Sequence, residues 1–216
     1  MNVNDVEEIE IEGDMLEAIF AKQKSLMDKY HVIEEKQGVG YGILKGNPFD
    51  INEIRSQCLV KDFAWRFTEE ITEASEGLLN GETAHFLEEL ADALHFITEL
   101  CIMVEITPKD LIGEFLGYNP DQDMFYKLFF VCGMPRKALP DTYKPIYHMG
   151  LAMNCLKQKP WKQTHILTDQ TAFKKHIIDS YRAFCEYMSH FEDDKTMASY
   201  YFKKNVVNQF RQDTQY

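Results

Sequence analysis

The stretch "ETAHFLEELADALHFITELCIMVE", Glu82–Glu105, carries apolar residues every three or four positions. They form one broad face of a helix: Phe86, Leu87, Leu90, Ala91, Leu94 and Ile97. A helix with such a face buries it against other helices. Alternating runs of β-branched residues are almost absent, and the helical period returns in four other segments: 14–36, 51–79, 168–191 and 195–216. The sequence therefore predicts an all-α helical bundle.

The composition narrows the class of protein. The chain has 216 residues and a formal charge of −12, which argues against nucleic acid or an anionic membrane as its partner. The five cysteines are widely spaced, and the histidines show no ligand spacing with them, so no zinc site or disulfide framework is indicated. The acidic N-terminus lacks the apolar core of a signal peptide. We expect a cytoplasmic protein.

The chain divides into two candidate helical hairpins within a single domain, 1–216. The first spans about 51–112 and breaks near Gly81, and the second spans about 141–196, after the loop-rich segments "GYNPDQD" and "GMPRKALPDTYKP". Both "FLEELADALHFI" and "FKKHIIDSYRAF" place an aspartate six residues after their first phenylalanine. Either two related hairpins or a chance likeness between amphipathic helices explains this.

Two pairs of carboxylates stand on either side of the break at Gly81. Glu70 and Glu73 are three residues apart, as are Glu89 and Asp92, so each pair lies on one helix face. Antiparallel helices would bring the pairs together as an oxygen cage suited to Mg²⁺ or Mn²⁺. The alternative is an ordinary solvated acidic face.

Three neighbours of these pairs are given other roles. Glu69 and Glu76 are expected at the surface, and Trp65 is expected in the core. Asp92 borders the apolar face described above, where an acid is costly unless it is paired or ligated. This cost favours the cage over the solvated face.

Both motifs resemble a known family. "EEITE" followed by "EELADALHF" is similar to the E-x-x-E…E-x-x-D signature of the all-α nucleoside-triphosphate pyrophosphatases, which include MazG-like proteins and dimeric dUTPases. The closing "YYFKKNVVNQFRQDTQY" resembles the final motif of dimeric all-α dUTPases and of tailed-phage dCTP/dUTP pyrophosphatases. The matching residues are Lys204, Asn205, Asn208, Arg211, Gln212 and Tyr216.

The resemblance implies an activity and roles for these residues. It implies a homodimer that hydrolyses dUTP to dUMP and pyrophosphate. The reaction would use two or three Mg²⁺ ions, and the enzyme would act in the host cytoplasm if the chain is of phage origin. Glu70 is then both a ligand and the base, with the other three acids as ligands. Lys204 and Arg211 lie two helical turns apart and would clamp phosphates, while Asn205 and Asn208 would orient sugar or phosphate.

The base specificity is the least defined part of this interpretation. Gln23 is the one candidate for the early glutamine of the family, and the glycine-rich loop 38–46 stands where relatives carry other base contacts. Trp161 and Lys162, in "KQKPWKQ", are either substrate contacts or a surface turn. The alternatives are a dCTP or dual dCTP/dUTP pyrophosphatase, a broad MazG-like house-cleaning enzyme, and a non-enzymatic helical interaction protein.

Overall fold

A computed structural model of the chain describes residues 1–37, 49–116, 121–130, 142–158, 161, 163 and 165–214. Within these ranges the protein is all-α, as predicted, and contains no strand. A short 3-10 helix (Val3–Asp5) precedes the helices α1 (Met15–Lys36), α2 (Ile54–Asn80), α3 (Thr83–Met103), α4 (Pro108–Leu116), α5 (Met124–Phe130), α6 (Tyr143–Cys155), α7 (Gln170–Met188) and α8 (Asp194–Asp213).

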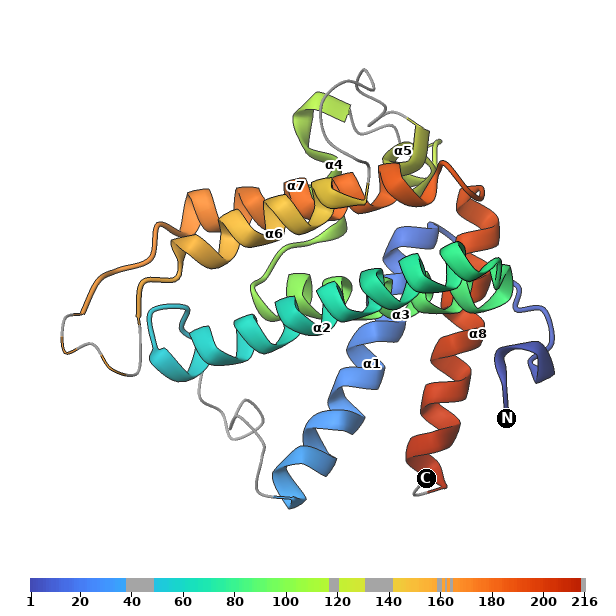
Figure 1. Cartoon of the computed structure of the whole chain (residues 1–216), viewed down its shortest axis with the longest axis horizontal. Coiled ribbons are helices and arrows are strands. Elements are labelled where there is room, and N and C mark those ends of the chain that lie inside the picture. The colour runs from blue at the N-terminus through green and yellow to red at the C-terminus, as the bar shows by residue number, and fades with distance from the viewer. Residues whose placement is uncertain are drawn as a thin grey trace.

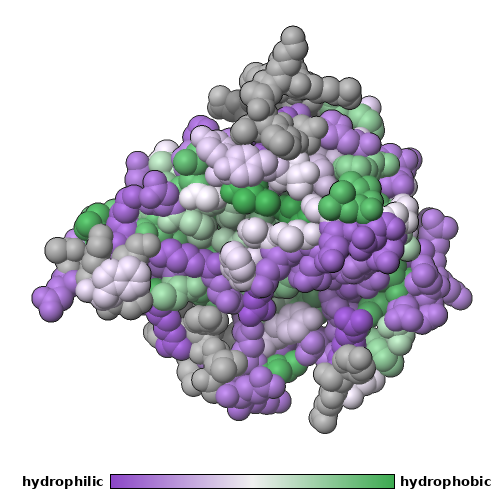
Figure 2. Space-filling model, in the orientation of Figure 1, coloured by the Kyte–Doolittle hydropathy of each residue, from purple (hydrophilic) through white to green (hydrophobic). Residues whose placement is uncertain are grey.

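The helices form two antiparallel pairs and a third layer (Figure 1). The α2–α3 pair lies below the α6–α7 pair in this view, and α1 and α8 pack across α3. One continuous hydrophobic cluster joins side chains of all eight helices. On the face in Figure 2, apolar side chains gather over α6 and α7 among mostly hydrophilic ones. None of the described helices combines the length and the apolarity that crossing a membrane requires.

Aspartates fix the starts of three helices. The Asp14 carboxylate accepts hydrogen bonds from the first backbone N–H groups of α1, and Asp169 and Asp193 do the same for α7 and α8. These bonds satisfy backbone donors that the first turn of a helix leaves unpaired. Helix α4 begins at Pro108, a favourable first residue because proline lacks the N–H that the first turn leaves unbonded.

Helix α5 was missed by the sequence interpretation, which placed only loops around it. The carboxylate of Asp123 accepts a hydrogen bond from Phe125 N at 2.8 Å and one from Met15 N at 2.7 Å. In turn, the Asp14 carboxylate accepts a hydrogen bond from Met124 N at 2.7 Å. These reciprocal bonds tie the first turns of α1 and α5 together, and such long-range capping is invisible to a local pattern.

Gly81 makes the turn between α2 and α3. Its φ of 75° and ψ of 20° are left-handed, and Glu82 N donates to Gly77 O at 2.8 Å, which closes the end of α2. The helices are close at this end, because a Cβ on Gly77 would lie 3.1 Å from Phe86 N. Glu73 and Glu89 stand eight residues before and after Gly81, so the turn places their carboxylates opposite each other.

Replacing Gly81 with alanine should lower the free energy of unfolding by about 1 kcal/mol, because a residue with a Cβ is sterically strained in the left-handed backbone conformation. Chemical denaturation of the purified chain measures this change. Gly150→Ala is the matched control, since Gly150 lies within α6 with no positive φ and open space around its Cβ position. It should be neutral or slightly stabilising. Equal stability of the two variants would contradict the role given to Gly81.

Candidate active site

Three of the four predicted carboxylates meet between α2 and α3. Glu70, Glu73 and Glu89 each offer an oxygen, and these oxygens lie within 4.8 Å of one another. Glu89 is buried, Glu70 is half-buried and Glu73 is exposed, so the cluster is open to solvent on one side. The exposed His85 places its Nδ1 3.1 Å from Glu89 Oε1.

The crowding of these acids changes their protonation. Burial raises the pKa of Glu70 to about 9, helped by its hydrogen bond with Glu89 and by the charges of Asp92, Glu89 and Glu73. At neutral pH Glu70 therefore holds a proton and donates it to Glu89. A cation in the cluster would replace that proton as the source of positive charge.

Asp92 lies beside this cluster but faces a cation of the protein itself. Lys204 Nζ, from α8, lies 2.7 Å from Asp92 Oδ2 and also donates to Glu88. Lys204 is only 5% exposed. Burial raises the pKa of Asp92 to about 6, although the Lys204 ammonium opposes the rise. Burial alone would lower the pKa of Lys204, but Asp92 and Glu88 raise it, so the lysine stays charged.

The remaining residues of the α8 motif lie along the same helix. Asn205 is buried and accepts a hydrogen bond from Gln209 Nε2 at 2.8 Å, while Asn208, Arg211 and Gln212 are half-buried. Gln212 hydrogen-bonds to Tyr30 of α1, and the Arg211 charge acts on the same phenol. Tyr216 lies outside the described residues. The structure thus brings Lys204 to the acids and places Arg211 and Gln212 against α1.

A family model described as dUTPase matches residues 77–216, more than half of the chain. The chain belongs to the dUTPase family. It is an enzyme, a dUTP diphosphatase that releases pyrophosphate from the nucleotide. The match includes Glu89, Asp92 and all of α8. Glu70 and Glu73 precede the matched residues, and it is their position beside Glu89 that associates them with the site. No curated protein and no solved structure matches the chain.

Gln23 of the dUTPase lies in the core between α1, α3 and α8. Its amide nitrogen donates to Glu99 Oε2 at 2.9 Å, and its oxygen accepts from Tyr201 at 3.0 Å. The residue is 1% exposed. Both ends of the predicted base-recognising amide are therefore bonded within the protein.

Glu99 was not singled out from the sequence, although it interrupts an apolar run as Asp92 does. Burial raises the pKa of Glu99 to about 8, while the Gln23 hydrogen bond opposes the rise. Burial also lowers the pKa of His31, whose Nε2 lies 3.8 Å from Glu99 Oε1. Both groups are therefore neutral near pH 7, and the contact is not an ion pair.

The stability of the dUTPase should fall as the pH rises from about 5 to 8. Unfolded Glu99 ionises near its ordinary pKa, whereas the folded state keeps it protonated up to about 8. The unfolded state then binds fewer protons, which costs roughly 3 kcal/mol by pH 7. Glu99→Gln keeps the hydrogen bond from Gln23 and removes this contribution. Urea denaturation of the wild type and of Glu99→Gln near pH 5 and near pH 8 measures this change in stability. The same pH dependence in both proteins would refute the assignment.

Trp161 lies far from the carboxylates within one chain. Its side chain is 77% exposed, in the connection between α6 and α7. Gln158 N donates to Gln57 Oε1 at 2.9 Å, which ties this connection to the first turn of α2. Glu70 stands thirteen residues further along α2, about 20 Å away. Lys162 and the glycine-rich loop 38–46 lie outside the described residues.

The prediction that Trp65 lies in the core is wrong. It is 62% exposed instead of buried, and its Nε1 donates to Glu69 Oε1 at 2.7 Å. The helical period alone does not separate the edge of an apolar face from its centre. Glu69 and Glu76 are exposed, as expected.

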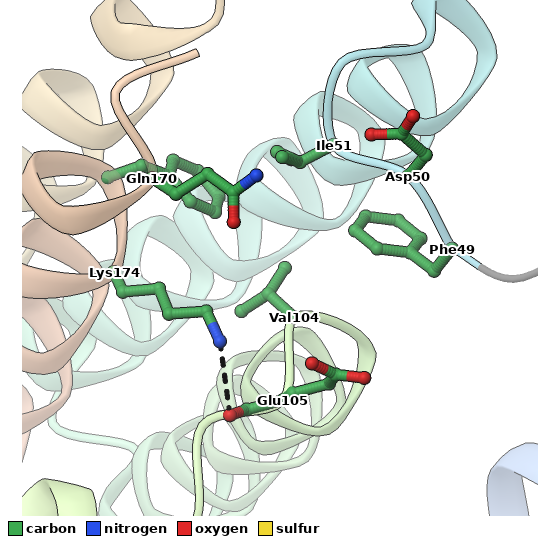
Figure 3. Close-up of a pocket in the computed structure, with 8 residues that line it drawn as sticks. Phe49, Asp50, Ile51, Val104, Glu105, Gln170 and Lys174 are labelled. Atoms are coloured by element: carbon green, nitrogen blue, oxygen red, sulfur yellow. Dashed lines mark hydrogen bonds between the residues drawn. The ribbon is translucent and has the colours of Figure 1, made fainter.

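A pocket of about 130 Å³ lies at the other end of α3 (Figure 3). Phe49, Ile51 and Val104 supply its apolar wall. Lys174 Nζ donates to Glu105 O at 3.3 Å, where Glu105 has a φ of 59°. The pocket is about 24 Å along α3 from Glu89 and contains none of the predicted site residues.

Proposed function

We propose that dUTP hydrolysis takes place at the α2–α3 carboxylates and requires Mg²⁺. The observation that carries this proposal is the convergence of Glu70, Glu73 and Glu89 within 4.8 Å. Their donors are all carboxylate oxygens, which suit a hard cation better than zinc or copper. The raised pKa of Glu70 supports the same view, since the acids do not all stay ionised without added positive charge.

Glu70, Glu73, Glu89 and Asp92 would hold the ions, two or three in number as the family resemblance implies. Bound Mg²⁺ supplies Lewis-acid activation of water and charge stabilisation at the phosphates. Glu70 is also the base in this proposal. A bound cation would displace the proton that Glu70 now holds, and the ionised carboxylate could then accept a proton from water. Lys204 holds Oδ2 of Asp92 at 2.7 Å, and the other oxygen of Asp92 would be left for an ion.

The α8 motif would bind the phosphates of the nucleotide. Lys204 bonds to Asp92 and to the partly exposed Glu88, so a phosphate oxygen can take the place of Glu88 without disturbing Asp92. Arg211 offers a bidentate fork two turns further along the helix. Asn205, Asn208, Gln212 and Tyr216 complete the phosphate and sugar contacts in this proposal.

The base contacts require more than one chain in our proposal. Gln23 would contact the base only after releasing its bonds to Glu99 and Tyr201. Trp161 and Lys162 would contact the nucleotide from the second copy of a homodimer, because the Trp161 connection is about 20 Å from Glu70 within one chain. We treat residues 1–216 as one catalytic domain, which the single hydrophobic cluster supports.

A cytoplasmic location is also part of the proposal. The four described cysteines are free thiols, as expected of a reducing compartment: Cys58, Cys101, Cys155 and Cys185. The formal charge of −12 argues against nucleic acid as a partner.

Pyrophosphate release from dUTP, dCTP and a panel of modified nucleoside triphosphates, each with Mg²⁺ or with EDTA, tests this proposal. We expect turnover of dUTP that EDTA abolishes and Mg²⁺ restores. Faster turnover of dCTP would favour the dual pyrophosphatase, and similar rates on modified nucleotides would favour the house-cleaning activity. Full activity in EDTA would contradict the metal site.

A further inference from the structure

A second group of metal-binding side chains lies in the α6–α7 pair. It consists of His148 from α6 and of His176 and Asp179 from α7. One ligand atom from each residue lies within 4.8 Å of those of the other two. All three residues are half-buried. The group belongs to the layer above α2 and α3, so it is separate from the acids of the proposed active site (Figure 1).

The two imidazoles have unused nitrogen atoms. The Nδ1 atoms of His148 and His176 are buried and have no hydrogen-bond partner among the described residues. His148 Nδ1 lies 4.0 Å from Asp179 Oδ2, too far for a hydrogen bond. Burial lowers the pKa of His148, so its ring is neutral and keeps a lone pair. Two buried ring nitrogens beside a carboxylate are costly as they stand, and a cation would satisfy all three.

The positions on α7 match those of the acids on α3. Phe86 and Phe173 open the similar segments "FLEELADALHFI" and "FKKHIIDSYRAF". Three residues later α3 has Glu89 and α7 has His176, and three residues after that both have an aspartate. The spacing that presents two oxygens in the α2–α3 pair thus presents a nitrogen and an oxygen in the α6–α7 pair.

We propose that His148, His176 and Asp179 form a second metal site, which binds Zn²⁺ or a similar transition-metal ion. Two imidazoles and one carboxylate suit borderline cations, whereas Mg²⁺ prefers oxygen ligands. Three protein ligands leave a fourth position open to water. The ion holds α6 against α7 at this point.

The surroundings allow an ion to enter. Asp179 lines an open groove of about 470 Å³ together with Asp110, Lys175 and Arg182. Lys175 now bonds to Asp179, but its side chain is 67% exposed and moves into water at little cost. The groove therefore provides a path from solvent to the carboxylate.

Calorimetric titration of the metal-stripped full-length chain with Zn²⁺ tests the site. Millimolar Mg²⁺ is kept present so that the acids between α2 and α3 are occupied. We expect the His148→Ala/His176→Ala double variant to bind one Zn²⁺ fewer per chain than the wild type. Asp179→Asn, which changes no volume, should weaken the same binding step. Titration with Co²⁺ should give visible absorption of a four-coordinate ion in the wild type only.

His190→Ala is the control, since His190 is an exposed histidine just beyond α7. It should bind Zn²⁺ as the wild type does. The double variant should keep its Mg²⁺-dependent dUTP turnover, and Glu73→Gln should keep its Zn²⁺ binding, so failure of one site is distinguishable from failure of the other. No Zn²⁺ binding by the wild type, or equal stoichiometry in wild type and double variant, would overturn the proposal.

Discussion

Glu73→Gln should lower the rate of dUTP hydrolysis roughly 10³-fold, because losing one ligand of the metal cluster removes several kcal/mol of stabilisation from the transition state. The fold should survive unchanged. Glu73 is exposed and its carboxylate faces two other acids, so the neutral amide relieves repulsion. Steady-state pyrophosphate release at saturating Mg²⁺ gives the rate, and thermal unfolding gives the stability.

Glu76→Gln is the matched control for this substitution. Glu76 lies on the same helix, one turn closer to Gly81, and is also exposed. It should retain wild-type turnover, because it lies outside the cluster. Equal activity of the two variants would mean that the acids of α2 are a solvated face and that the metal lies elsewhere.

Lys204→Met should reduce both stability and turnover. Removing one member of a buried ion pair costs about 3–5 kcal/mol, and the partial exposure of Asp92 and Glu88 reduces this to about 2 kcal/mol here. Without the ammonium, the pKa of Asp92 rises further, so a cation must displace a proton more often to bind there and its affinity falls. Urea denaturation and the dUTP assay measure the two effects.

A double variant separates these two effects. Lys204→Met combined with Asp92→Asn should recover stability, since no buried charge remains unpaired, but it should stay inactive. Lys203→Met, at the neighbouring half-buried position, serves as the control and should behave as the wild type. A Lys204→Met protein with wild-type stability would show that the contact with Asp92 contributes nothing to the fold.

The sequence predicts the parts of this structure that depend on local spacing. The helical period places α1 and α7 correctly, because the residues that make up each period lie within a few positions of one another. The i, i+3 spacing and the break at Gly81 likewise predict that Glu70, Glu73 and Glu89 converge.

Contacts between distant segments escape the same reasoning. The ion pair of Lys204 with Asp92 depends on how α8 crosses α3, and spacing along α8 carries no information about that crossing. The pairing of His148 with His176 depends in the same way on the packing of two helices. Glu99 did have a local signal, an acid inside the apolar run "ITELCIM", and the desolvation argument used for Asp92 applies to it equally.

The place of Lys204 in the chain has a consequence for the order of folding. The hairpin of α2 and α3 is local and can form early, but its acids receive their lysine from a helix 116 residues beyond Glu88. During synthesis the carboxylates of α2 and α3 therefore leave the ribosome long before the cation that neutralises them. The hairpin reaches its final charge balance only when α8 has docked, so Glu88 and Asp92 lack their cation until then.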